Sequence, residues 1–448
     1  MKLIEGKNYF SNIGLLVPEI ILPRDKVDMT KWACVACDQF TSSPEYWQNQ
    51  YLYIGNAPSA AKIVLPEICL NQRVSLAGES QSTSVQTRID NINNNMAKYL
   101  RDGTLSKTFN GLVYVERTLP NGKVRKGIIA ALDLEQYDFK KNVKALIRPT
   151  EETVRERIPS RLQIRSDAPL ELPHSIVLVD DLPNGITTFL ANRKASSVPL
   201  YDFELLGGGG SIAAYGITDP NTISSVAAMI IDCKKEEDAL YFVGDGNHSF
   251  AAAKAHWEKL KRDGAPPDHP ARFMLTEIES IHDPAIVMEP IHRVLFNCDF
   301  DKLFGLFSKY FNSTNAFWRE YSTPMTAEEI DEMLSESSRV LEYSILVIVS
   351  SIRTAVLYLD ARTYPFAVSA VTDFIDFMMP DAKIDYVHGT EEAMNLTEGG
   401  FATAILLPKP SKREIFKIAS QGRILPRKTF SMGEAETKRY YIEARKIR

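Results

Sequence analysis

The sequence lacks any apolar run that approaches the roughly 18 residues a membrane-spanning helix requires. Its first residues, Met1 to Lys7, contain no hydrophobic stretch like that of a secretory signal peptide. It also lacks a basic excess, because its formal net charge is −5 over 448 residues, and it shows no recognisable helix-turn-helix. We therefore expect a cytoplasmic protein that binds neither membranes nor nucleic acid.

Cysteine is scarce, and its spacing disfavours metal chemistry. Cys34 and Cys37 form a single C-x-x-C pair, and the other three of the five cysteines are scattered. A zinc site needs a second pair, or a histidine pair at matching spacing, and the sequence has neither. Residues 32–38 read as a mostly apolar strand, not as the turn into a helix that a thioredoxin-like site requires. We expect buried, reduced thiols.

A run of four glycines, Gly207 to Gly210, also lacks what would make it a nucleotide loop. No Walker lysine follows it, and it fits neither the P-loop nor the Rossmann pattern. It predicts a mobile loop near a ligand or a simple connection.

The rest of the chain alternates strand and helix patterns, which predicts an α+β fold of mixed sheets with flanking helices. Two β-hairpins are expected, at 112–116 with 124–134 around Asn121-Gly122, and at 343–349 with 354–359. Helices are predicted at 151–158, 222–231, 301–311, 327–335 and 370–379, and residues 423–448 predict a final strand and helix. We expect an N-terminal region, 1–300, and a C-terminal region, 301–448, packed on it or merged with it into one unit.

The most informative stretch is Tyr241 to Phe250, which predicts a buried strand, a glycine turn and the start of a helix. Such a turn leaves unpaired backbone N–H groups at the positive end of the helix dipole, where anions and above all phosphate bind. Asp245 would hold a metal or accept a proton, and His248 would donate to a phosphate oxygen. In the alternative interpretation, Asp245 or Asn247 merely caps the helix and His248 is solvated.

Three other polar clusters follow short predicted strands, where sites in α/β sheets are usually built. They contain Arg148 with Glu151 and Glu152, then Glu289 with His292 and Arg293, and finally Asp385 with His388. Each is also compatible with a purely structural cluster. The chain has only seven histidines, and three of them lie at such strand–turn junctions.

These segments resemble a large bacterial and archaeal family known as domain of unknown function 1015. The box at 244–249, Gly-Asp-Gly-Asn-His-Ser, is similar to the family's Asp-Gly-His-His-Arg box. Residues 148–153 resemble its Arg-His-Glu-x-Thr segment, 290–293 its Pro-Thr-His-Arg segment, and 385–389 its late His-Gly turn. Asp38 lies where the family carries Pro-Tyr-Asp. The resemblance spans nearly the whole chain.

The family's box is in turn similar to the phosphate-binding box of the ParB and sulfiredoxin superfamily, which includes archaeal kinases that phosphorylate free serine. The resemblance implies a ParB/sulfiredoxin-like core with large elaborations, and a nucleotide phosphate over Gly246 to Ser249. This chain departs from the box at Asn247, where the family has its first histidine, and at Ser249, where it has arginine. The missing arginine removes a bidentate phosphate contact, which Arg293, Arg148 or Lys254 would have to replace.

Two functions follow from this resemblance. The first is a kinase that transfers a phosphoryl group from ATP or ADP, with Mg²⁺, to a small metabolite in amino-acid metabolism, such as free serine. In it, Gly246, Asn247, His248 and Ser249 would form the phosphate cradle, and Asp245 would be the metal ligand or base.

The remaining candidates would complete that site, with Glu289 or Asp38 as the alternative base and His292, Arg293, Arg148 and His388 binding the nucleotide.

The second function is a nucleotide-binding regulatory module without catalysis, which the missing box arginine favours. Neither function fixes the oligomeric state, and a ParB-like DNA-binding protein is disfavoured. The kinase requires Asp245, His248, His292, Arg293 and Arg148 or His388 to line one pocket.

Overall fold

The computed structural model describes residues 8–41, 43–70, 74–76, 78–79, 83–141, 143–194, 197–234, 239–312, 316–337, 342–420 and 423–448. The chain separates into two compact units. Unit 1 comprises Met1–Ile286, Ala419–Arg423 and Gly433–Arg448, and unit 2 comprises Val287–Ile418 and Ile424–Met432. These bounds differ from the expected 1–300 and 301–448, because unit 2 begins at Val287 and the chain returns to unit 1 at Ala419–Arg423 and again at Gly433–Arg448.

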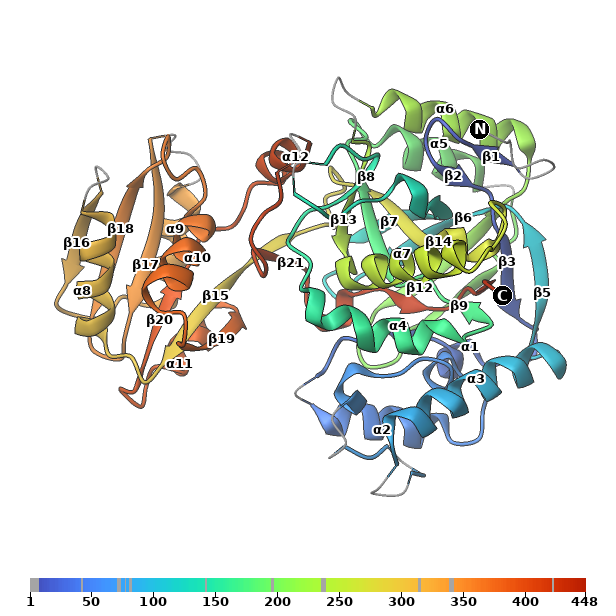
Figure 1. Cartoon of the computed structure of the whole chain (residues 1–448), viewed down its shortest axis with the longest axis horizontal. Coiled ribbons are helices and arrows are strands. Elements are labelled where there is room, and N and C mark those ends of the chain that lie inside the picture. The colour runs from blue at the N-terminus through green and yellow to red at the C-terminus, as the bar shows by residue number, and fades with distance from the viewer. Residues whose placement is uncertain are drawn as a thin grey trace. The chain divides into compact units, whose positions relative to one another are not determined.

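Unit 1 is built on a mixed sheet, which contains ten strands in the described part of the chain (Figure 1). Along its main path the strands are β11 (Tyr201–Glu204), β12 (Ser211–Ile217), β6 (Leu112–Thr118), β7 (Val124–Asp133), β14 (Phe273–Ser280), β10 (Ser175–Val179), β13 (Tyr241–Asp245) and β8 (Ile147–Pro149). The other two are β1 (Tyr9–Phe10) and β2 (Leu15–Leu16), and β2 pairs with β7.

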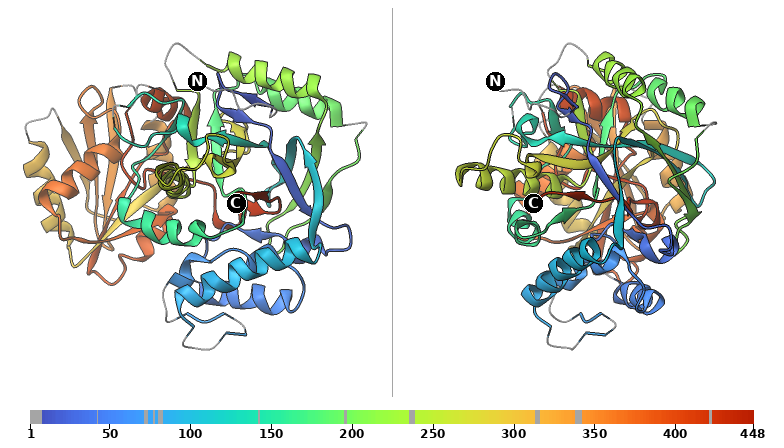
Figure 2. Two further views of the ribbon diagram at one scale, coloured as in Figure 1. Left: turned by 45° about the vertical axis from the view of Figure 1, so that its right-hand side comes forward. Right: turned by 90° about the vertical axis from the view of Figure 1, so that its right-hand side faces the viewer.

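Each face of this sheet is covered by its own hydrophobic core, because side chains alternate along a strand. On β6, Val113 and Val115 belong to one core, whereas Leu112 and Tyr114 belong to the other. The helices of unit 1 are α1 (Met29–Trp32), α2 (Pro44–Ile54), α3 (Val85–Arg101), α4 (Ile158–Ser166), α5 (Gly185–Lys194), α6 (Pro220–Asp232) and α7 (Asn247–Arg262). Helices α4 and α7 pack against each other (Figures 1 and 2).

The segment Gly433–Arg448 is an integral part of unit 1. Its β22 (Tyr440–Tyr441) pairs with β4 (Cys34–Val35), and its β23 (Arg445–Lys446) pairs with β9 (Leu170–Glu171). A third small sheet joins β3 (Glu19–Pro23) to β5 (Leu105–Asn110), which lie side by side in both views of Figure 2. The helix predicted within 423–448 is wrong: the described residues there form short strands and one 3-10 helix, Ala435–Thr437.

Unit 2 has a seven-stranded sheet in its described residues. Its strands are β16 (Phe317–Tyr321), β18 (Thr354–Asp360), β17 (Tyr343–Val349), β20 (Ala402–Leu406), β15 (Met288–Phe296), β19 (Lys383–His388) and β21 (Phe430–Met432). Its helices are α8 (Phe300–Phe311), α9 (Ala327–Ser337), α10 (Ala367–Met378) and α11 (Thr390–Asn395), and α12 (Lys412–Ser420) runs across the boundary with unit 1.

The predicted α+β class, with mixed sheets and flanking helices, is confirmed, and so are both β-hairpins. The helix predicted at 151–158 is only partly present: a 3-10 helix spans Arg155–Arg157, and α4 begins at Ile158, where Pro159 occupies the first turn. The five cysteines are free thiols, and three of them are buried. Within the described residues, no helix is both long and apolar enough to cross a membrane.

Candidate functional site

The strand–turn–helix predicted at 241–250 is present in unit 1. Strand β13 ends at Asp245, Gly246 adopts a left-handed conformation with φ 84°, and α7 begins at Asn247. Among the described residues no side chain caps this helix, so neither Asp245 nor Asn247 plays the capping role of the alternative interpretation. The Asp245 carboxylate instead accepts the Gly246 N–H at 2.9 Å. The N–H groups of the first turn thus have no side-chain cap, which is the arrangement that favours an anion.

Gly246 is required by its surroundings as well as by its φ. A Cβ at this position would lie 2.4 Å from Ser175 Oγ and 3.0 Å from the His174 ring. Ser175 Oγ also donates to the Gly246 carbonyl at 3.2 Å. The turn is therefore closed on its protein side, and any larger residue must displace β10.

We expect Gly246→Ala to destabilise the protein by about 1–3 kcal/mol for the left-handed conformation alone, and by more because of the collision with Ser175. Gly264→Ala is the matched control, because Gly264 has φ +94° but no atom within 4 Å of its ideal Cβ. Urea unfolding of both variants measures the difference. An equal decrease in the free energy of unfolding in the two variants would show that the turn accommodates a Cβ.

Asp245 is held by a lysine from a distant part of the sequence. Lys438 Nζ lies 3.1 Å from Asp245 Oδ2, and its side chain is only 8% exposed. The charge of Lys438 also helps to lower the pKa of Asp38, so one ammonium group stabilises the ionised form of two carboxylates. A Mg²⁺ ion bound by Asp245 would have to compete with this ammonium group.

The described residues do not form a preassembled metal site. They contain no group of three histidine, cysteine, aspartate or glutamate side chains placed to hold a metal. Mg²⁺ is commonly bound through one or two carboxylates together with substrate phosphates and water. Asp245 fits that pattern only as a single ligand, and only where a nucleotide supplies most of the coordination.

The predicted Arg148 segment lies directly beside the turn. Strand β8 pairs in parallel with β13, which places Arg148 opposite Phe242. Thr150 Oγ1 donates to the Val243 carbonyl at 2.8 Å, and the Val154 N–H donates to His248 Nε2 at 3.1 Å. Arg148 is 1% exposed, and burial lowers the pKa of its guanidinium. Two of the predicted segments, 148–154 and 244–249, are thus brought together.

The three polar side chains of the turn have different surroundings. His248 Nε2 accepts a backbone hydrogen bond, so in the neutral ring its proton is on Nδ1, and only that nitrogen can donate to a phosphate. Asn247 Oδ1 is buried and accepts no hydrogen bond from the described residues. Ser249, in the first turn of α7, lines a cavity of about 150 Å³.

This cavity, which we call the α7 cavity, contains Asp38 and a histidine that the sequence did not suggest. Its polar lining includes Asp38, His174, Tyr441 and Cys37, together with Ser249. His174 Nε2 lies 3.5 Å from Asp38 Oδ2, and its Nδ1 lies 2.5 Å from the Tyr441 hydroxyl. That hydroxyl donates to Cys37 Sγ at 3.2 Å.

The carboxylate and the imidazole at this cavity determine each other's charge. Burial alone would raise the pKa of Asp38, but the neighbouring His174 outweighs burial and holds that pKa below its usual value. Burial alone would lower the pKa of His174, but Asp38 outweighs it and raises that pKa well above its usual value. Asp38 is therefore a carboxylate at neutral pH, with an imidazolium beside it.

Sequence reasoning missed His174, Tyr441 and Lys438. His174 immediately precedes β10, and a histidine at a strand boundary is the signal that singled out His248, His292 and His388. Tyr441 and Lys438 carried no local signal, because their neighbours in the site are some 200 to 400 positions away.

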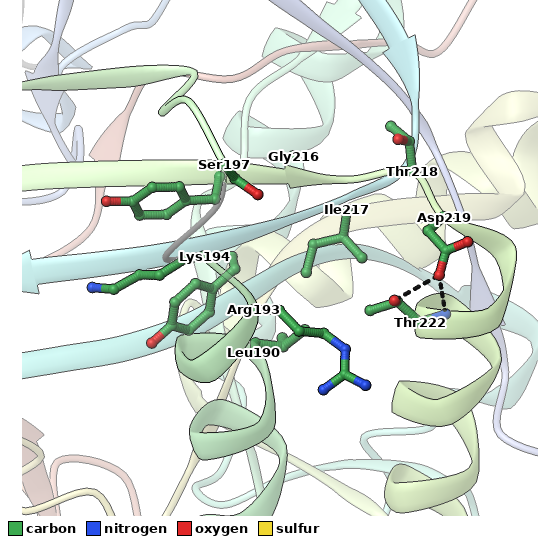
Figure 3. Close-up of a pocket in the computed structure, with 11 residues that line it drawn as sticks. Leu190, Arg193, Lys194, Ser197, Gly216, Ile217, Thr218, Asp219 and Thr222 are labelled. Carbon is green, nitrogen blue, oxygen red and sulfur yellow. Dashed lines mark hydrogen bonds between the residues drawn. The ribbon is translucent and has the colours of Figure 1, made fainter.

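A second cavity, of about 230 Å³, lies elsewhere in unit 1 and shares no lining residue with the first. It is lined by residues of α5, β12 and α6 (Figure 3). Its cations already have partners, since Lys194 pairs with Glu116 and Arg193 stacks on Phe189. Asp219 caps α6 by accepting from the Thr222 N–H and hydroxyl. This cavity is larger, but it is lined by none of the predicted site residues.

The remaining predicted residues belong to unit 2. Glu289 pairs with Lys409 at 2.9 Å. His292 and Arg293 lie on β15 and are each 1% exposed, while His388 is exposed at the end of β19. His292 Nδ1 accepts the Leu407 N–H at 3.1 Å, which is a structural contact. That these residues line one pocket with Asp245 and His248 stays a prediction.

His292 predicts an acid-sensitive unit 2. Burial, helped by Arg293 and His388, lowers the pKa of His292 to about 4. The unfolded chain, with a histidine pKa of about 6.5, binds the proton first, so stability present above this pH is lost as pH falls towards 4. We expect the free energy of unfolding of unit 2 to fall by up to ~1.4 kcal/mol per pH unit. Urea unfolding followed by NMR signals of residues in unit 2 measures this slope.

The matched variants are His292→Asn, which removes this group, and His388→Asn, which removes the exposed histidine nearby. The first should abolish most of the slope and the second should keep most of it. An unchanged slope in His292→Asn would contradict this assignment.

Fold and site together define an α+β protein with an uncapped strand–turn–helix beside a cavity that contains a carboxylate. The model of the family described as "Protein of unknown function (DUF1015)" matches residues 21–378. This is well over half of the chain, so the protein belongs to that family. The match includes Asp38, His174 and the turn at 245–249, whereas Lys438 and Tyr441 lie outside it. A search of curated proteins found no match.

Several solved structures resemble the chain at low identity. Free serine kinase in complex with AMP is 13% identical, with a TM-score of 0.38 over 71% of this chain and 92% of that chain. A mutant of free serine kinase in complex with ADP is 12% identical, with the same TM-score and coverage. SbnI from Staphylococcus aureus, truncated at its C-terminus, is 10% identical, with a TM-score of 0.35 over 70% and 82%. At these TM-scores the likeness carries no argument about function, and the ParB/sulfiredoxin kinship stays a prediction.

Proposed function

We propose that this protein is a small-molecule kinase that transfers a phosphoryl group from ATP or ADP to a hydroxylated metabolite. The observation that carries the proposal is the juxtaposition at Ser249. This residue belongs to the uncapped first turn of α7 and also lines the α7 cavity, which contains Asp38. A phosphate over the turn would lie next to an acceptor in the cavity, which is the arrangement that phosphoryl transfer requires.

The residues of the turn would bind the nucleotide through the backbone. The N–H groups after Gly246 and the dipole of α7 attract the phosphate, and the His248 ring, whose Nε2 accepts from the Val154 N–H, would donate through Nδ1. Lys438, paired with Asp245, supplies a positive charge where the family's box has an arginine and this chain has Ser249. Mg²⁺, when bound with the nucleotide, would neutralise phosphate charge, with Asp245 as its one protein ligand.

Asp38 is the residue we assign as the base, because it lines the cavity and is held ionised. The acceptor hydroxyl oxygen forms a bond to the terminal phosphorus of the nucleotide while the bond from that phosphorus to the bridging oxygen breaks. The hydroxyl proton passes to Asp38, and the shortened nucleotide leaves with the electron pair. His174 and Tyr441 position Asp38 and do not enter the reaction themselves.

The direct test is phosphoryl transfer measured by ³¹P NMR with ATP, ADP and Mg²⁺, against a panel of hydroxylated metabolites that includes free serine. A new phosphate ester that forms in proportion to nucleotide consumed is the expected result. Nucleotide that binds at micromolar concentration but never reacts with any acceptor would refute the kinase.

Lys438 gives a prediction about binding. Charged hydrogen bonds are worth about 1.5–3 kcal/mol, so Lys438→Met should weaken nucleotide binding by roughly 10- to 150-fold. Lys446→Met is the matched control, because Lys446 is exposed on β23. Calorimetry on both variants, with melting temperature as the check on folding, makes the comparison. Equal affinities in the two variants would remove Lys438 from the nucleotide site.

The second candidate is a nucleotide-binding regulatory module without turnover. Ser249 favours it, because no arginine stands at the box position that would stabilise transition-state charge. In such a module nucleotide alters protease sensitivity, and no phosphate ester forms.

A further inference from the structure

The α7 cavity has walls that suit an apolar molecule. Six of the side chains that form them are Ile63, Leu65, Met96, Ile164, Leu172 and Met274. They come from the segment between α2 and α3, from α3 and α4, from the residue after β9, and from β14. A ligand that buries aliphatic carbon against these side chains is stabilised in proportion to the apolar area removed from water.

The charged groups at the cavity already have partners. Arg161 pairs with Glu67 at 2.6 Å, and Arg165 pairs with Glu171 at 2.5 Å. Asp38 and His174 pair with each other. No charged residue that lines the described cavity is left to neutralise a ligand's ammonium or carboxylate group, and an unpaired charge is costly to bury.

Two polar groups remain that suit uncharged oxygens. The Asp38 carboxylate can accept a hydrogen bond from a hydroxyl group. The hydroxyl-bearing side chain of Ser249 also lines the cavity, and a hydroxyl can donate to a neutral oxygen without adding charge. The cavity volume of about 150 Å³ equals that of an engineered apolar cavity that admits benzene.

We infer that the α7 cavity binds a small neutral alcohol with an apolar body and a second uncharged oxygen, and that it selects against free amino acids and hydroxy acids. The inference rests on the proposed function in taking this ligand as the phosphoryl acceptor. The hydroxyl group lies at Asp38, the second oxygen at Ser249, and the carbon body against the apolar walls.

Two probes of nearly equal size test the role of charge. Methyl 3-hydroxybutanoate is neutral, whereas 3-hydroxybutanoate carries a carboxylate, and L-serine serves as the zwitterion. With methyl-labelled methionine, the signals of Met96 and Met274 report occupancy without nucleotide. We expect the neutral ester to shift both signals saturably, with at least tenfold higher affinity than either charged probe. Equal or tighter binding of a charged probe, or no shift with any probe, would overturn the inference.

Filling the cavity provides the control for location. Ala252 lines it and is 2% exposed, so Ala252→Leu should abolish the shifts. Ala255→Leu, on the same helix but outside the cavity, should retain them. If Ala252→Leu does not fold, Ala168→Leu fills the cavity from another wall. Shifts that persist in a folded cavity-filled variant would place the ester elsewhere and refute the site.

The outcome is separable from that of the proposed function. If the ester occupies the cavity but no acceptor is ever phosphorylated, the kinase fails and the neutral-ligand site stands. If L-serine is phosphorylated while the ester neither binds nor reacts, the kinase stands and this inference fails.

Discussion

Asp38→Asn is expected to lower the rate of phosphoryl transfer by roughly 10²–10⁴-fold, the range typical of general-base catalysis. Asn keeps the shape of the side chain but cannot take the acceptor's proton. Nucleotide affinity should change less than about threefold, because the proposed cradle is mainly backbone at α7. Steady-state kinetics with calorimetry on the same preparations separates the two effects.

The matched control is Asp25→Asn, an aspartate in the same unit whose side chain is 88% exposed. It should leave turnover unchanged. The pH profile of the phosphoryl-transfer rate adds a second check, because His174 pairs with Asp38 and the pKa of His174 is raised by that carboxylate. Loss of nucleotide binding in parallel with turnover would mean that Asp38 supports the turn and is not the base.

The strand–turn–helix could be predicted from sequence because its causes are local. Tyr241 to Val243 are apolar, Gly246 occupies the one position that requires positive φ, and the apolar residues of α7 recur at helical spacing. The two hairpins were predictable for the same reason. The segment 151–158 was not, because Thr150 and Val154 bond to Val243 and His248, almost a hundred residues away, and this non-local pairing overrides local helix preference.

The rest of the site could not be read from sequence, because it is assembled by the return of the chain to unit 1. Lys438 and Tyr441 follow the whole of unit 2 and yet contact Asp245 and His174. The sequence of this segment predicted a final strand and helix. In the structure Lys438, Arg439 and Arg445 are buried among acidic side chains, so their charges offset those of buried carboxylates.

This return also connects stability with the proposed site. The strands β22 and β23 hold the segment in unit 1, with Tyr441 in β22 and Lys438 two residues before that strand. Whatever loosens this segment should therefore affect the turn and the α7 cavity together. Arg439, between the two site residues, is the position at which this coupling is most directly measured.

Arg439→Met is expected to destabilise unit 1 by about 3–5 kcal/mol, the range for breaking a buried ion pair. Arg439 is 2% exposed, its Nε lies 3.1 Å from Glu277 Oε2, and its Nη2 donates to Glu443. Burial alone would lower the pKa of Arg439, but Glu443 and Glu277 outweigh it and raise that pKa. Methionine fills most of the space and leaves both carboxylates buried without their cation. Urea unfolding followed by the fluorescence of Trp32, Trp47 and Trp257, all buried in unit 1, measures the loss.

Arg448→Met is the matched control from the same segment. Arg448 pairs with Asp167 at 3.3 Å, but both side chains are largely exposed, and exposed pairs contribute about 0–1 kcal/mol. Adding Glu443→Gln to Arg439→Met should recover part of the stability, because it removes one of the two stranded charges. If Arg439→Met lowers the free energy of unfolding no more than Arg448→Met does, the Glu277 and Glu443 carboxylates are stabilised without Arg439. The segment is then held by its apolar contacts alone. In that case Tyr441 and Lys438 would keep their places, and the rate of phosphoryl transfer would be unchanged in the variant.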